Sequence, residues 1–102
     1  MSLSVEVKNK VNSVVVTVTG DVDFSTVHDL LAVMTEHREQ SISIDCSGLS
    51  FIDSTGIGLI LRTIMELGET GCEITLDAVP PQIQEILDEM GVSDILHELA
   101  GR

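Results

Sequence analysis

The 102-residue sequence predicts an α/β fold, in which a four-stranded mixed, mostly parallel sheet packs against about four helices. Three observations predict it. Short alternating or β-branched runs recur along the chain, as expected of strands. Segments with apolar residues at i, i+3, i+4 and i+7 separate them, as expected of amphipathic helices. Glycine, proline and asparagine stand between the two kinds of segment. Strand and helix patterns that alternate in this way favour parallel strands joined by right-handed crossovers.

The first two strands are predicted at the N-terminal end. Residues 3–8 alternate between apolar and polar side chains, and residues 9–12 supply turn-forming chemistry. Residues 13–19 are β-branched throughout except at the first position, which favours a central strand buried on both faces. We expect an antiparallel hairpin, with the first strand at one edge of the sheet.

The first helix and the third strand follow. Residues 20–24 read as a loop, after which Ser25 or Thr26 is suited to cap a helix. The apolar stripe of that helix comprises Val27, Leu30, Leu31 and Met34. Residues 41–46 then predict another strand.

The second helix is predicted after a loop at residues 47–53. It starts at Ser54, and Gly68 and Gly71 bracket its end. Its buried stripe comprises Ile57, Ile60, Ile64 and Leu61. Residues 72–77 predict the fourth strand.

Two shorter helices complete the expected order. The pair of prolines at positions 80 and 81 suits the first turn of the third helix, and Gly91 ends it. Its apolar stripe comprises Ile83, Ile86, Leu87 and Met90. Ser93 is suited to cap the last helix.

Loops at the carboxyl ends of parallel strands meet at one edge of a sheet. Residues 20–24 and 47–54 should therefore converge on a candidate site.

Length, composition and net charge restrict the classes of function open to this chain. The length predicts a single domain over residues 1–102, and the N-terminus does not resemble a secretory signal, so we expect a cytoplasmic protein. The net charge of −12 disfavours nucleic acid and anionic membranes as partners. Nine acids fall between two successive arginines, Arg62 and Arg102. They suit a basic partner face or simply solubility.

Cys46 and Cys72 fit no zinc pattern and are expected to be buried, reduced thiols.

The most informative stretch surrounds Ser54, at the predicted junction of strand, loop and helix. Its hydroxyl is suited to cap the helix. Gly56 and Gly58 each cost about 1 kcal/mol relative to alanine in a helix interior. Two glycines in one first turn indicate a close approach, either of helix to sheet or of a partner to the turn. Both explanations remain open on spacing alone.

Enzymatic interpretations of Ser54 are disfavoured. A nucleophile elbow requires glycine two residues before the serine, where Ile52 stands. A P-loop requires a lysine that the sequence near Gly58 lacks. A metal or acid–base site at Asp21 and Asp23 would have only Asp45 and Asp53 as further candidates, so we expect neither a metal nor a cofactor. The remaining interpretation is a serine that is itself modified. A phosphate at the start of the second helix would meet its free amides and positive dipole end.

These residues resemble the STAS-domain anti-sigma factor antagonists of bacteria. The match rests on residues 53–58, Asp-Ser-Thr-Gly-Ile-Gly, on residues 20–23, Gly-Asp-Val-Asp, and on Gly91. The resemblance covers essentially the whole chain. It implies a STAS-like domain that works as a binding protein and not as an enzyme. In that family the serine of the motif is phosphorylated by a kinase that is also the anti-sigma factor, and a phosphatase resets it.

The resemblance implies roles for particular residues. Ser54 would be the phosphoacceptor, and its unmodified form would bind the anti-sigma factor kinase, to which ATP would belong. The partner-binding residues would be Asp21, Asp23, Asp53, Ser54, Thr55, Gly56, Gly58 and Leu59. For Leu59, which falls outside the buried stripe, partial burial and partner contact both remain open. The chain would be a monomer or weak dimer. Relatives also serve other assemblies, so docking on an ABC-type transporter ATPase without phosphorylation is the alternative.

Overall fold

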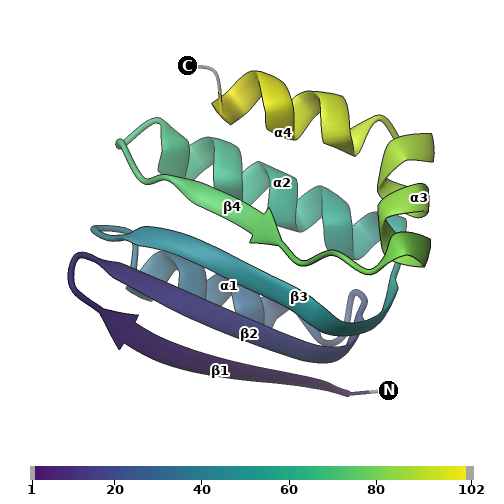
Figure 1. Cartoon of the computed structure of the whole chain (residues 1–102), viewed down its shortest axis with the longest axis horizontal. Helices are drawn as coiled ribbons and strands as arrows, with labels where there is room; N and C mark the ends of the chain where they lie inside the picture. The colour runs from purple at the N-terminus through teal and green to yellow at the C-terminus, as the bar shows by residue number, and fades with distance from the viewer. Residues whose placement is uncertain (1, 101–102) are drawn as a thin grey trace.

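The computed structural model describes residues 2–100, and its elements follow the expected order (Figure 1). The strands are β1 (Leu3–Lys10), β2 (Ser13–Val22), β3 (Ser41–Ile52) and β4 (Ile74–Asp77). The helices are α1 (Val27–Glu36), α2 (Ser54–Gly68), α3 (Pro81–Glu89) and α4 (Val92–Ala100). In this part of the chain, no helix combines the length and apolar character that a membrane crossing requires.

The four strands form one mixed sheet in the order β1-β2-β3-β4. β1 pairs with β2 antiparallel, whereas β2 with β3 and β3 with β4 are parallel. The predicted fold class and the antiparallel edge strand are therefore confirmed. Lys10 pairs with Ser13, which leaves a two-residue turn in which Asn12 has a φ of 60°. Asparagine tolerates this left-handed conformation better than most residues do.

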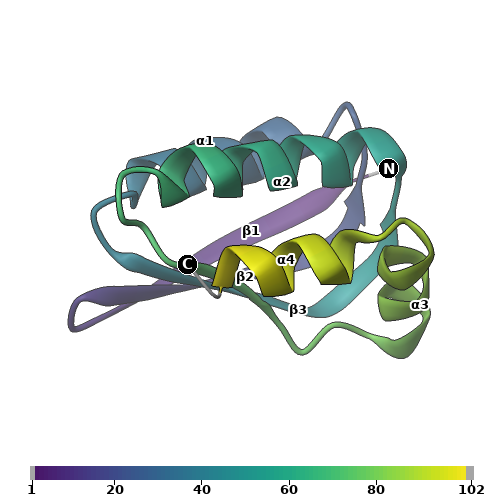
Figure 2. The ribbon, with the colours of Figure 1, turned by 90° about the horizontal axis from the view of Figure 1, so that it is seen from above.

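The core lies between the sheet and the helices. α1 and α2 lie together over one face of the sheet, as Figure 2 shows, and α4 lies beside α2. Along β2, Val14, Val16 and Val18 are buried, but Val15 and Thr17 on the opposite face are only half-buried. The prediction that β2 is buried on both faces is therefore wrong, because α1 and α2 cover a single face.

Two segments that read as loops are extensions of the central strands. β3 continues through residues 47–52, and β2 continues to Val22, with register shifts on the way. Glycine makes these irregular ends possible. Gly20 has a φ of +113°, and a Cβ there would lie 2.3 Å from the backbone oxygen of Ser2. The loops expected to converge thus meet as paired strands, with Asp21 opposite Phe51.

The helix boundaries are close to the expected ones. α3 begins at Pro81, and Gly91 follows its end with a φ of 76°. Thr26 precedes α1 but its side chain does not cap it. Ser93 lies inside the first turn of α4, where its hydroxyl donates a hydrogen bond to Asp88 Oδ1 at 2.6 Å instead of capping.

Candidate functional site

Ser54 is the first residue of α2, directly after the end of β3, and it is exposed to solvent. The helix cap is supplied by Asp53, whose backbone is extended (φ −105°, ψ 172°). Its Oδ1 accepts a hydrogen bond of 2.7 Å from the backbone N–H of Gly56. The interpretation of Ser54 as the cap is therefore wrong. Because the carboxylate takes that role, the Ser54 side chain stands one position further along, at the surface.

A backbone hydrogen bond joins the start of α2 to the end of β2. The backbone N–H of Asp53 donates to the carbonyl of Val22 at 3.1 Å. Gly56 fits into the same junction, since a Cβ there would lie 2.7 Å from Val22 Cγ1 and 3.1 Å from the Val22 oxygen. Close packing of helix on sheet explains this glycine. Gly58 differs, because a Cβ at that position would meet nothing within 4 Å.

The turn between β2 and α1 is organised by Asp23. Its Oδ1 accepts hydrogen bonds from Ser25 N at 2.8 Å, Ser25 Oγ at 2.7 Å and Thr26 N at 3.1 Å. These bonds favour the ionised carboxylate, and the bond from the Ser25 hydroxyl does most to lower its pKa below the usual value. The Thr26 hydroxyl donates to the Asp21 carbonyl at 2.8 Å. Asp23 therefore shapes the loop beside α2.

The expected binding residues differ in accessibility. Ser54, Thr55 and Gly58 are exposed, and Gly56 is buried. The half-buried members are Asp21, Asp23, Asp53 and Leu59. Leu59 packs against the core, so its partial burial is confirmed. Among the expected binding residues, the accessible ones thus lie near the start of α2, bordered by half-buried carboxylates.

Two aromatic residues that the sequence patterns did not single out adjoin the two motifs along the chain. Phe24 and Phe51 are 67% and 40% exposed. Phe24 directly follows Asp23 and packs edge-to-face with His28, at a centroid distance of 5.8 Å. A signal was present, since these are the two aromatic residues of the chain and both adjoin the motifs. Exposed aromatic side chains are frequent anchors in protein interfaces.

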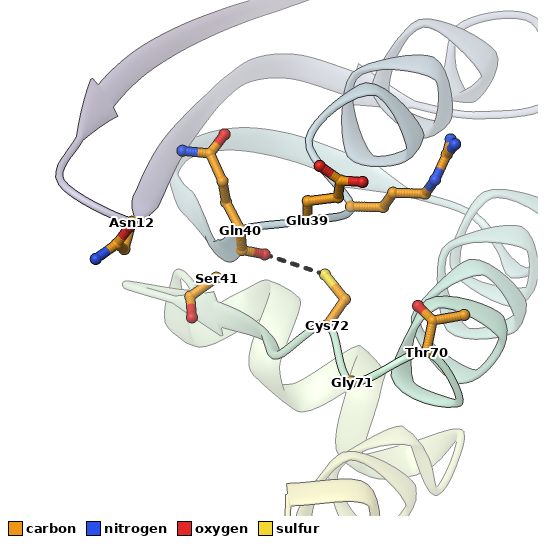
Figure 3. A pocket seen from close by; sticks show the side chains of 8 residues that line it. Asn12, Glu39, Gln40, Ser41, Thr70, Gly71 and Cys72 are labelled. Carbon is orange, nitrogen blue, oxygen red and sulfur yellow. Dashed lines mark hydrogen bonds between the residues drawn. The ribbon is translucent and has the colours of Figure 1, made fainter.

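Other reactive groups lie apart from this turn. Cys46 and Cys72 are free and buried, and burial raises the pKa of the Cys46 thiol to about 11. A pocket of about 490 Å³ lies at the opposite end of the sheet, beside Ser41 at the start of β3. Figure 3 shows the residues that line it. It is lined by loop residues including Asn12, Arg38 and Thr70, and there Cys72 Sγ donates to the Gln40 carbonyl at 3.3 Å. Within residues 2–100, no three His, Cys, Asp or Glu side chains gather as metal ligands.

Known proteins provide an independent comparison. The chain is 29% identical over 100 residues to the anti-sigma-B factor antagonist of Staphylococcus aureus, covering 95% of this chain and 93% of that protein. The corresponding Staphylococcus epidermidis protein is 27% identical over the same length and coverage.

Solved structures share the fold. An anti-sigma factor antagonist from Mycobacterium paratuberculosis superposes with a TM-score of 0.73 at 18% identity, covering 96% of this chain and 94% of that one. The phosphorylated form of SpoIIAA, a Bacillus cell fate determinant, gives a TM-score of 0.69 at 22% identity, with coverages of 89% and 86%. The sequence profile of the family described as Mlab, STAS domain matches residues 5–98. Because that match spans nearly the whole chain, the protein belongs to this STAS-domain family.

Proposed function

We propose that this protein is an anti-sigma factor antagonist that is released from its anti-sigma factor when Ser54 is phosphorylated. The observation that carries the proposal is the exposed Ser54 side chain at the start of α2, beside a carboxylate that already caps the helix. The names of the staphylococcal relatives support the antagonist role. The reaction would be catalysed by the partner kinase, so this chain supplies the acceptor hydroxyl and no catalytic group.

Phosphorylation should change binding more than folding. A phosphoserine carries a charge of about −1.5 to −2 at neutral pH. Near the N-terminus of α2 that charge is stabilised by about 0.3–1 kcal/mol. A partner covering the turn would instead have to bury a dianion near Asp53, at a cost of about 3–4 kcal/mol. The second effect is larger, and it corresponds to a loss of affinity of several hundredfold, about tenfold for each 1.4 kcal/mol.

The proposed contact surface centres on the first turn of α2. Thr55 and Gly58 are accessible there, and the open space around Gly58 lets a partner approach the helix backbone closely. Phe24 and Phe51 would serve as apolar anchors at its border. The half-buried carboxylates Asp21, Asp23 and Asp53, together with Leu59 and the buried Gly56, would shape and support this surface. The system would operate in the cytoplasm, with a serine phosphatase restoring the hydroxyl.

Mass spectrometry tests the proposal. Each kinase-type anti-sigma factor of the host would be purified and incubated with the full chain, ATP and magnesium. We expect one of them to add a single phosphate at Ser54, to leave Ser54→Ala unmodified, and to modify Thr55→Ala. Modification at another residue, or by none of these kinases, would contradict the proposal. If Ser54→Asp instead binds an ABC-type transporter ATPase as tightly as the unmodified chain does, the alternative function is supported.

A further inference from the structure

The outer edge of β1 offers backbone groups for pairing. The Asp21 N–H bonds to the Ser2 carbonyl at 2.9 Å, and Lys10 pairs with Ser13 around the two-residue turn. In an antiparallel ladder, bonded pairs alternate with non-bonded ones along the strand. The even-numbered residues of β1 therefore bond to β2. The odd-numbered residues direct their N–H and C=O groups away from the sheet, and they are Leu3, Val5, Val7 and Asn9.

The charges along β1 set this edge apart from the rest of the molecule. The strand carries Glu6, Lys8 and Lys10, a net charge of +1, in a chain whose net charge is −12. Two copies of such an acidic protein repel each other least where they meet through a locally basic edge. Val7 adds an apolar contact, since it is 37% exposed although it lies on the face of the sheet that bears the core.

We propose that this edge binds a second copy of the chain, with the two β1 strands antiparallel and the twofold axis at Val7. In that register Val7 lies opposite Val7 of the second copy, and the outward backbone groups of both strands bond to each other. Glu6 lies opposite Lys8 of the second copy, and Lys8 opposite its Glu6. Opposite charges placed directly across two strands stabilise the pair. β1 is self-complementary in this register.

The arrangement leaves the Ser54 surface accessible. The twofold axis reverses the strand direction, so the carboxyl ends of β2 and β3 in the two copies point in opposite directions. The two Ser54 sites would stand at opposite ends of one continuous sheet. β4, at the other edge, has four residues against eight in β1, which makes it a shorter template for pairing. The proposal is independent of whether Ser54 is phosphorylated.

Charge exchange tests the pairing. Sedimentation equilibrium of the wild-type chain, at concentrations up to about 0.5 mM, should show reversible dimers of the weak, small-interface class. In a dimer of either Glu6→Lys or Lys8→Glu, both cross-strand pairs formed by positions 6 and 8 carry like charges. Each variant should therefore weaken self-association by about tenfold to a hundredfold. An equimolar mixture of these two variants should form a heterodimer, because each Lys then faces a Glu.

Lys10→Glu is the matched control. It changes the net charge as much as Lys8→Glu does, but position 10 would lie opposite Ser4, so dimers should be weakened far less. Circular dichroism would verify that each variant is folded, and Val7→Pro, which removes an outward N–H, should abolish the dimer. The proposal is overturned if the wild type remains monomeric, if the mixture fails to associate, or if Lys10→Glu weakens the dimer as much as Lys8→Glu.

Discussion

At the residue scale, the division of roles between Asp53 and Ser54 defines the site. The Asp53 carboxylate satisfies the Gly56 N–H, and Ser54 is therefore available at the surface without leaving the helix end uncapped. Aspartate and serine are both good helix caps, so the sequence alone does not show which of the two adjacent residues caps α2. Asp53 takes this role because its backbone is extended, a conformation that its hydrogen bond to Val22 fixes.

Gly56 and Gly58, near the start of α2, give a matched pair of substitutions. Gly56→Ala should destabilise the protein by about 1–3 kcal/mol, because the new Cβ would overlap Val22, including its backbone oxygen. Gly58→Ala should stabilise it by up to about 1 kcal/mol, since the methyl group enters open space and alanine favours the helix. Urea unfolding measures both values. Equal effects of the two substitutions would contradict the different roles assigned to these glycines.

Binding separates the role of Gly58 from its effect on folding. If a partner approaches the helix there, Gly58→Ala should weaken binding of the anti-sigma factor at least about tenfold, the equivalent of 1.4 kcal/mol, even though the fold is more stable. Unchanged affinity in calorimetric titration would remove Gly58 from the contact surface.

At the element scale, the Asp23 carboxylate in the β2–α1 turn makes the stability of the domain depend on pH. Hydrogen bonds lower the pKa of Asp23 below its ordinary 3.8, so the folded state favours the ionised carboxylate. Its contribution to stability is therefore present above about pH 4 and is lost as the pH falls through the lower, folded-state pKa. The unfolding free energy of Asp23→Asn should consequently depend less steeply on pH below about pH 4 than that of the wild type does.

Ser25→Ala is the companion variant for this turn. It removes the hydroxyl that does most to lower the pKa, while the backbone donors remain. The Asp23 pKa, followed by NMR titration, should rise towards its ordinary value. A pKa equal to that of the wild type would show that the hydroxyl does not stabilise the carboxylate.

The elements themselves were predictable to different degrees. The helices followed from apolar spacing, because each buries one stripe such as Ile57, Ile60 and Ile64 of α2. The far ends of β2 and β3 did not. Residues 47–52 combine serine and glycine with apolar residues, and their strand conformation depends on pairing with β2 across register shifts. Local sequence does not specify such cross-strand pairs. The convergence of the two segments was nevertheless correct, because it depends on strand direction.

At the scale of the whole molecule, net charge should limit stability. The chain carries −12, and the described residues contain the exposed ion pair Arg62–Glu66, a class of contact that contributes little. Added salt weakens both the repulsion among the acidic side chains and the attraction within ion pairs. The weakened repulsion should be the larger of the two effects. Raising NaCl from about 0.02 M to 0.5 M should raise Tm, by about 4–8 °C for each 1 kcal/mol recovered. A falling Tm in both NaCl and KCl would mean that local attractions dominate.

The whole fold also separates the site from the rest of the surface. The Ser54 turn lies at the carboxyl end of the parallel strands, and the pocket beside Asn12, whose lining Figure 3 shows, lies at the other end, where β3 begins. Charge added at the first end should disturb the partner contact, whereas charge added at the second should not. Ser41, exposed at the start of β3, provides a control position there.

The most direct test compares affinity and folding in the same phosphorylated sample. The full chain with phosphoserine at position 54 would be titrated calorimetrically with the anti-sigma factor identified by the kinase assay, and unfolded in urea, alongside the unmodified chain and Ser41→Asp. We expect a Kd raised several hundredfold, about 3–4 kcal/mol, for phosphoserine 54 alone, with an unfolding free energy within about 1 kcal/mol of the unmodified chain. Unchanged affinity, or affinity lost because the domain unfolds, would rule out a phosphorylation switch at Ser54.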